Sequence, residues 1–149
     1  MIALLQRVSS ASVAVDGVVI AEITAGLLVF IGVERNDSEQ QAERLAERLI
    51  NYRVFADDEG KMNDSLIDTG GDMLLVPQFT LAADTGSGNR PGFSSAADPE
   101  SGQQLFTYLV AAVRQHGQKA STGQFGADMQ VTLCNEGPVT FSLRVSPAG

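Results

Sequence analysis

The chain has 149 residues, of which 44% are hydrophobic and 19% charged, and its formal net charge is −8 at pH 7. This length and composition are typical of one globular domain over residues 1–149, and no segment reaches the roughly 20 consecutive apolar residues of a membrane span. The negative charge has the wrong sign for general electrostatic binding of nucleic acid, so we expect no DNA partner and only local contacts with any polyanion.

The N-terminal part of the chain is predicted to be β-structure. Residues 2–8 and 10–23 alternate apolar and polar side chains, and Asp16-Gly17 is a strong signal for a two-residue hairpin turn. Residues 26–33 are apolar throughout, which predicts a central strand. The first residues lack a basic segment followed by an apolar run and a cleavage site, so we expect a cytoplasmic protein.

Two helices are predicted from their start signals. Ser38 with Gln41 resembles a capping box, and apolar residues then recur at helical spacing to about residue 52. Asp98 as N-cap and Pro99 at the first helical position open a second helix, which ends near Gly117.

The segment between the two helices is predicted to contain a strand and a loop. The strand is expected within residues 70–84, "GGDMLLVPQFTLAAD". Residues 85–100 are polar and rich in glycine, serine and proline, which indicates a long surface loop. Loops of this length often carry functional residues.

Two alternating strands, at about residues 128–134 and 139–145, are predicted to finish the chain. Gly137 and Pro138 precede the second of them, and both residue types weaken strand pairing. The pair is therefore either an ordinary bulge or a functional piece of backbone. The element order predicts an α+β fold in which two helices pack on one mostly antiparallel or mixed sheet.

Histidine-dependent and metal-dependent chemistry finds little support in the sequence. His116 is the only histidine, and we expect it to complement the dipole at the end of the second helix. Cys134 is the only cysteine, and we expect it to be buried and unreactive. Because these two residues lie in separate segments, no Ser-His-Asp or Cys-His pair and no zinc site of the usual ligand types is indicated.

Several ungapped segments of the chain together resemble the D-aminoacyl-tRNA deacylases, the family once called D-tyrosyl-tRNA deacylases. In family order they are "MIALLQRVSSASV", "AGLLVFIGV", "GKMN", "QFTL", "NRPGFS", "TGQFGADMQV" and "GPVTF". The resemblance implies a deacylase-type fold that forms a two-fold homodimer. It also implies hydrolysis of the ester that joins a D-amino acid to the 3′ end of tRNA, with no metal and no organic cofactor.

The resemblance also implies which residues form the site. The family's Gln-Phe-Thr falls on Gln78, Phe79 and Thr80, and its cross-subunit Gly-cisPro falls on Gly137 and Pro138. The active site is thereby expected at the dimer interface, between the first segment of one subunit and the second segment of the other.

The chain departs from the family pattern at two places beside these motifs. Pro77 stands where the family usually has serine, and it offers neither a hydroxyl nor a backbone N–H. Residues 85–89, often basic in relatives, are "TGSGN" here, so Arg90 is the only cation of that loop.

An aminoacyl ester is already activated, so its hydrolysis mainly requires positioning, one water molecule and stabilisation of the oxyanion. We expect the backbone N–H groups of Phe79 and Thr80 to stabilise the oxyanion. The Thr80 hydroxyl is an alternative nucleophile, although no base is in sight to activate it. The carbonyls of Gly137 and Pro138 are expected to bind the ammonium group and exclude an L side chain. Glycyl-tRNA, which has no side chain to exclude, is an expected second substrate.

Two other functions remain open at the level of sequence. A non-catalytic dimeric module could bind amino-acid-like ligands in the same cleft, and a generic esterase could hydrolyse simple esters without tRNA. A turnover assay distinguishes the binding module from an enzyme, because a binding module leaves the ester intact even when protein is in excess.

Overall fold

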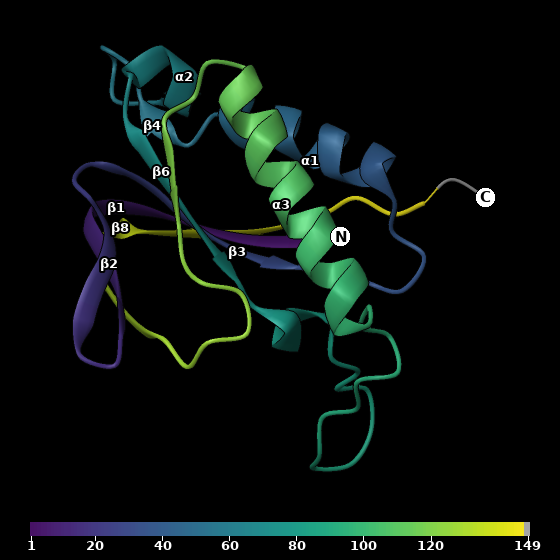
Figure 1. Cartoon of the computed structure of the whole chain (residues 1–149). Helices are drawn as coiled ribbons and strands as arrows, with labels where there is room; N and C mark the ends of the chain where they lie inside the picture. The colour runs from purple at the N-terminus through teal and green to yellow at the C-terminus, as the bar shows by residue number, and fades with distance from the viewer. Residues whose placement is uncertain (148–149) are drawn as a thin grey trace.

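A six-stranded mixed sheet organises residues 1–147, the part of the chain that the computed structural model describes (Figure 1). Strand β1 pairs antiparallel with β2, β3 and β8, whereas β6 runs parallel to both β3 and β7. The expected α+β fold with a mixed sheet is confirmed. The strands are β1 (Ile2–Val15), β2 (Val18–Ile23), β3 (Gly26–Gly32), β6 (Asp72–Pro77), β7 (Ala120–Thr122) and β8 (Gln130–Arg144).

Two long helices, α1 (Glu39–Asn51) and α3 (Pro99–Gln115), lie side by side over the sheet, as expected (Figure 1). A third helix within residues 1–147, α2 (Leu66–Thr69), was not predicted. Neither was a separate small sheet of β4 (Phe55–Ala56) and β5 (Met62–Asp64). These elements are too short to produce a recognisable hydrophobic period.

The predicted helix start signals are confirmed by the hydrogen bonds at the two long helices. The Ser38 backbone N–H donates to Gln41 Oε1 at 2.8 Å at the start of α1. At the start of α3, the Ser101 N–H donates to Asp98 Oδ2 at 3.4 Å. Both side chains satisfy backbone groups that a helix end would otherwise leave unpaired.

The terminal strands are longer than the sequence suggested. The Asp16-Gly17 turn is confirmed, with φ values of 51° and 79° at these residues. However, β1 is one strand of 14 residues, and β8 is one strand of 15 residues that continues past the Gly-Pro pair, where its register with β1 shifts. The prediction of two separate C-terminal strands was therefore wrong.

Strand β3 is buried on both faces, which confirms its predicted central position. Leu27, Val29 and Ile31 pack in the cluster beneath α1 and α3, and Leu28 packs in the cluster on the opposite face. The sheet therefore has two apolar layers, and the end of β3 is held rigidly between β1 and β6.

The ammonium group of Met1 is buried where three chain segments meet. It forms salt bridges with Asp37 at 2.8 Å and Glu34 at 3.2 Å, and it donates to the Val145 carbonyl at 2.7 Å. The Asp37 side chain is 0% exposed. Arg144 contacts the other oxygen of Glu34 at 2.8 Å. This network joins the start of β1 to the segment after β3 and the end of β8.

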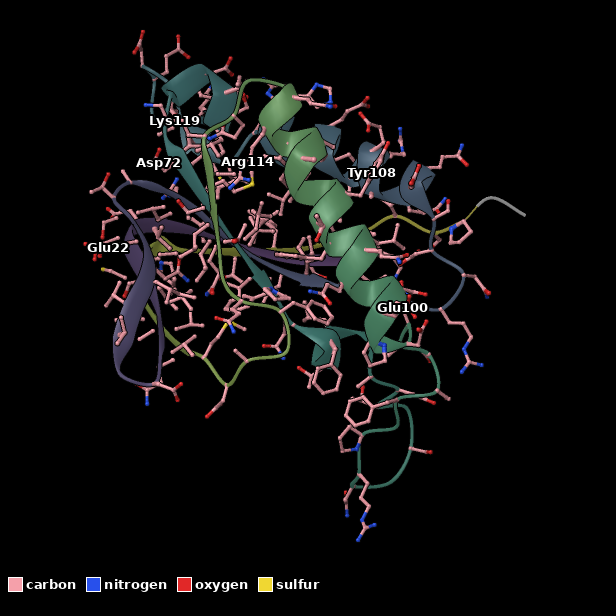
Figure 2. All side chains as sticks on the ribbon, viewed as in Figure 1. Glu22, Asp72, Glu100, Tyr108, Arg114 and Lys119 are labelled. Atoms are coloured by element: carbon pink, nitrogen blue, oxygen red, sulfur yellow. The ribbon has the colours of Figure 1, made fainter. Side chains whose placement is uncertain are left out.

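The last turn of α3 is tied to the sheet by Arg114, whose position is shown in Figure 2. Its Nη2 donates to the Ala120 carbonyl in β7 at 2.9 Å.

None of the described helices is long and apolar enough to cross a lipid bilayer.

Cys134 is exposed, so the expectation that it is buried was wrong. Along the first part of β8, Val131, Leu133 and Asn135 are partly buried, whereas Thr132 and Cys134 are exposed. The period-2 alternation of a strand therefore places the thiol on the outward face.

Candidate active site

A cavity of about 490 Å³ lies where the ends of β3 and β6 meet the N-terminal half of α3. Its walls come from four separate parts of the chain, and this volume is typical of small-molecule sites. Two of these parts include residues of the segments "QFTL" and "TGQFGADMQV", which carry the family resemblance. The principal wall residues are Ile31, Val76, Pro77, Phe106, Phe125 and Met129.

The predicted residues Gln78, Phe79 and Thr80 lie together directly after β6. Gln78 and Phe79 line the cavity, and the Gln78 side-chain amide donates to the Thr80 hydroxyl. The strand predicted within residues 70–84 ends at Pro77, and the chain then forms a 3₁₀ helix, η1 (Phe79–Ala82). Phe79 is 59% exposed, so it lies at the rim of the cavity.

The start of η1 leaves two backbone N–H groups free. The Gln78 N–H donates to the Ile31 carbonyl at 2.7 Å, and the Leu81 N–H donates to the Gln78 carbonyl at 3.2 Å. Between them, the N–H groups of Phe79 and Thr80 donate no hydrogen bond to any group in residues 1–147. A helix start produces such unpaired donors because no earlier carbonyl is in reach. They are available to a ligand oxygen.

The long loop before α3 covers the outer side of Phe79. The rings of Phe79 and Phe93 lie 5.2 Å apart between centroids, at an angle of 47°. Asp84 and Gly92 exchange two backbone hydrogen bonds at the base of the loop, at 2.7 and 2.9 Å. The predicted surface loop is thus a hairpin-like flap beside the cavity.

The lining of this cavity includes two carboxylates, Asp98 and Asp128, and no lysine or arginine among the described residues. Hydrogen bonds from the Ser101 side chain, and then from its backbone N–H, hold the pKa of Asp98 below its ordinary value. Asp98 therefore remains ionised near neutral pH. The wall favours a cationic or neutral group over a phosphate.

Gly137 and Pro138 lie on a bulge of β8, away from the cavity of their own chain. Gln6 and Val8 of β1 pair with Thr140 and Asn135, so residues 136–139 oppose Arg7 alone. The peptide bond between Gly137 and Pro138 is cis, as the resemblance implied. Neither residue lines the cavity, so a single chain does not bring them together with Gln78, Phe79 and Thr80.

Arg7 holds the bulge from inside, and no sequence motif marks it for this role. Its Nε donates to the Glu136 carbonyl at 3.1 Å, and its Nη1 donates to the Val54 carbonyl at 2.9 Å. Both acceptors are backbone atoms distant in sequence, so no motif could have indicated the contact.

The matches with known proteins cover nearly the whole chain. Residues 4–144 match the family model described as D-Tyr-tRNA(Tyr) deacylase. The chain belongs to the D-aminoacyl-tRNA deacylase family. A relative of that name from Nitrosococcus oceani is 57% identical over 99% of this chain and 96% of its own length. Another, from Xanthomonas axonopodis pv. citri, is 60% identical over 97% and 99%.

Two solved structures share the fold of this chain. The structure of "c-Myc DNA Unwinding Element Binding Protein" superposes with a TM-score of 0.93 and 36% identity, over 99% of this chain and 100% of that one. A probable eukaryotic D-amino acid tRNA deacylase has a TM-score of 0.77 and 18% identity, over 95% and 98%. The second likeness shows the fold alone, and the expected deacylase-type fold is confirmed.

Pro77, which stands where the deacylase family usually has serine, lies in the wall of the cavity. It is buried, it pairs in register with Ile31, and it ends β6. A proline lacks a backbone N–H, so position 77 contributes no hydrogen-bond donor to the site.

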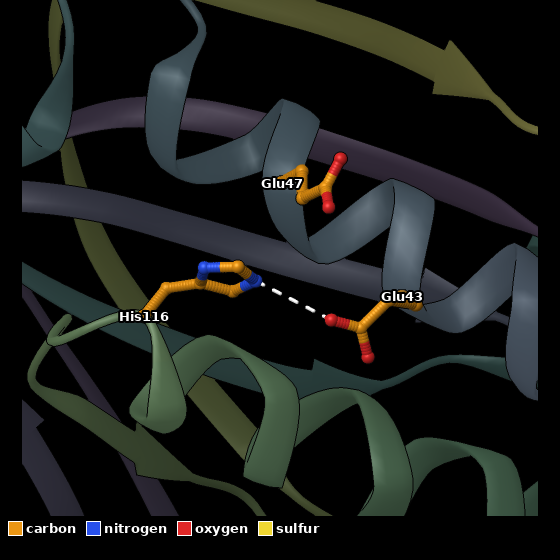
Figure 3. Close-up of side chains that lie close together, drawn as sticks. All are labelled: Glu43, Glu47 and His116. Atoms are coloured by element: carbon orange, nitrogen blue, oxygen red, sulfur yellow. Dashed lines mark ion pairs between the residues drawn. The ribbon is translucent and has the colours of Figure 1, made fainter.

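Outside the cavity, one group of potential metal ligands occurs within residues 1–147: Glu43, Glu47 and His116 (Figure 3). Their ligand atoms lie within 4.8 Å of one another, and His116 pairs with Glu43 at 3.4 Å. All three are at least partly exposed, and exposed groups of this kind commonly exist without a metal. His116 caps the end of α3, roughly 20 Å along the helix axis from Gly102 in the cavity wall. It therefore connects α1 with α3 rather than serving the cavity.

Proposed function

We propose that the chain hydrolyses D-aminoacyl-tRNA to a free D-amino acid and tRNA, as a homodimer in the cytoplasm. The observation that carries this proposal is the pair of free N–H groups, those of Phe79 and Thr80, at the rim of the cavity in a chain of this family. The cavity would receive the 3′ end of the tRNA, and the activity would remove D-amino acids before translation uses them.

The chemistry requires little from side chains because the ester is already activated. The protonated α-amino group withdraws electrons from the carbonyl, and the neighbouring ribose hydroxyl can assist the attack of water. The two free N–H groups would stabilise the oxyanion as it forms. The Gln78 amide bonds the Thr80 hydroxyl, which suits a hydroxyl that orients the substrate rather than one that attacks it. No step in this scheme calls for a metal or a cofactor.

Selectivity for the D form would come from the partner subunit. Gly137 and Pro138 are exposed and absent from their own cavity, which suits insertion into the cavity of a second copy. Their carbonyls would bind the substrate's ammonium group and fill the space of an L side chain. Because exclusion cannot reject a smaller group, we propose glycyl-tRNA as a second substrate.

The charge of the chain limits how tRNA can bind. At a net charge of −8, a broad electrostatic grip on any nucleic acid is unfavourable, so we propose no DNA partner despite the name of one structural neighbour. Contact with tRNA would be confined to its end, with Arg90 in the exposed loop as a local cation.

The test is single-turnover deacylation of D-, L- and glycyl-tRNA that carry the same tRNA, with enzyme in excess. We expect hydrolysis of the D and glycyl esters and little of the L ester. An intact D ester would indicate the binding module, and equal hydrolysis of simple esters without tRNA would indicate a generic esterase.

Subunit complementation tests the composite site. A Gly137→Ala dimer and a Phe79→Pro dimer, which lacks one of the two proposed oxyanion donors, are each expected to be weakly active. After subunit exchange, half of the dimers would carry one intact site, which restores about a quarter of the wild-type rate in a two-fold dimer. No recovery after verified exchange would show that each site lies within one chain.

A further inference from the structure

The base of the Gly-Pro bulge is closed by one side chain, Asn135. Its Nδ2 donates to Thr140 Oγ1 at 2.9 Å, and its Oδ1 accepts from the Val139 N–H at 3.1 Å. Gln6 Nε2 donates to the same Thr140 hydroxyl at 3.2 Å. Asn135 itself precedes the bulge, residues 136–139, and its amide thus joins the last bulge residue, Val139, to the first residue after it, Thr140.

This connection is needed because the bulge lacks ordinary strand pairing. In the register of β1 and β8, residues 136–139 stand opposite Arg7 alone, so four residues occupy the place of one. The bulge residues Gly137 and Pro138 are exposed, whereas Asn135 is partly buried. Arg7 holds only the first carbonyl of the bulge, that of Glu136. At the other end of the bulge, Asn135 holds Val139 and Thr140, where β8 pairs with β1 again.

We infer that Asn135 is a positioning residue for the proposed reaction, with Thr140 as its partner. The two hydrogen bonds of the Asn135 amide set the width of the bulge at its base. That width sets the direction in which the backbone of Gly137 and Pro138 projects from the sheet. This inference rests on the proposed function, in which that backbone excludes the L side chain.

The decisive variants are Asn135→Ala, which removes both hydrogen bonds, and Thr140→Val, which keeps the shape and removes the hydroxyl. Thr132→Val is the matched control, because Thr132 is an exposed threonine of the same strand outside the bulge. Asn135→Asp should rescue, because a carboxylate can accept from both the Val139 N–H and the Thr140 hydroxyl.

The measurement is the ratio of single-turnover rates on D- and L-aminoacyl-tRNA, together with the melting temperature. We expect the ratio to fall about tenfold in Asn135→Ala and Thr140→Val, because both variants lose the Asn135–Thr140 hydrogen bond at the base of the bulge. It should stay near the wild-type value in Thr132→Val and Asn135→Asp. A lower melting temperature with an unchanged ratio in the first two variants would overturn the inference and leave Asn135 a purely structural role.

Failure of this inference is distinguishable from failure of the proposed function. A wild-type chain that does not hydrolyse the D ester contradicts the proposed function itself. If Gly137→Ala changes the D-to-L ratio but Asn135→Ala and Thr140→Val behave like Thr132→Val, the bulge selects without help from Asn135, and only the inference is wrong.

Discussion

The backbone N–H of Gln78 donates to the carbonyl of Ile31 at 2.7 Å, and this is the last hydrogen bond before the two free donors of η1. The bond fixes the start of η1 to β3, a strand that is buried on both faces. Donors held in this way need little rearrangement when a negative charge develops on a substrate oxygen.

Removal of one main-chain donor should be costly. Phe79→Pro deletes an N–H at the first position of η1, where proline fits a helix start, and Gln78, with φ of −143° and ψ of 84°, lies outside the α region that a following proline disfavours. Phe79→Ala removes the same ring but keeps the N–H. We expect the proline variant to react about a hundredfold or more slowly than the alanine variant in single-turnover assays. Equal rates would show that this N–H does not stabilise the transition state.

Loss of the Thr80 hydroxyl should have a smaller effect. In Thr80→Ala the Gln78 amide loses its partner, but the proposed oxyanion donors remain. We expect a rate loss below about a hundredfold, the usual minimum for an oxyanion donor. Rapid-quench kinetics would check this. Complete inactivity of a folded variant, or an acyl group trapped on wild-type Thr80, would instead identify the hydroxyl as the nucleophile.

Rate and chirality should separate between the two halves of the site. Gln78→Ala should slow hydrolysis of the D ester without opening the site to the L ester. Gly137→Ala should lower both the rate on the D ester and the selectivity against the L ester. At Gly137 φ is +131°, and a Cβ would lie 2.8 Å from Val139 Cγ2. The measurement is single-turnover deacylation of the D, L and glycyl esters. Efficient L hydrolysis by Gln78→Ala would assign chirality to side chains.

Asp37→Asn should strongly destabilise the fold. The change leaves the Met1 ammonium without its closest carboxylate, at a place where the Asp37 side chain is 0% exposed. Breaking a buried ion pair by removing one partner typically costs roughly 3–5 kcal/mol. Urea denaturation of a chain with a free Met1 amine checks this. The control Glu39→Gln alters an exposed carboxylate and should change the free energy of unfolding by less than about 0.5 kcal/mol.

Acid should weaken the start of α3 through Asp98. Its hydrogen bonds with Ser101 lower its pKa in the folded state, so its contribution to stability is complete above the unfolded carboxyl's pKa of about 3.9. That contribution is lost as the pH falls through the lowered folded-state pKa. Melting temperatures from pH 2 to 6 should therefore depend less steeply on pH in Asp98→Asn than in the wild type. Parallel curves would contradict this assignment.

Local signals made much of this fold predictable from sequence. The Asp16-Gly17 turn, the Ser38 cap and the Asp98-Pro99 helix start each depend on residues within four positions of one another. Their physical basis is therefore visible in a short stretch of sequence. The same is true of the apolar residues 26–33, whose pattern indicated burial on both faces.

Other features could not be predicted because they depend on distant partners or mimic another pattern. Phe79 and Leu81 alternate with polar Gln78 and Thr80 as in a strand, but the chain leaves the sheet after Pro77 and turns into a 3₁₀ helix. Arg7 meets Glu136 across 129 positions, so its contact with the bulge is invisible in either segment alone. The sequence therefore predicted the two segments of the candidate site, but not the contacts that hold them in place.

The outward thiol of Cys134 provides a natural attachment point for a probe. It is the chain's only cysteine, it is exposed, and it stands three positions before Gly137 on the same strand. A nitroxide label would therefore attach at one defined place without any engineered cysteine. In a two-fold dimer the labels on the two chains would give a single interspin distance by pulsed electron paramagnetic resonance. A change in that distance when a substrate analogue is added would report movement beside the bulge.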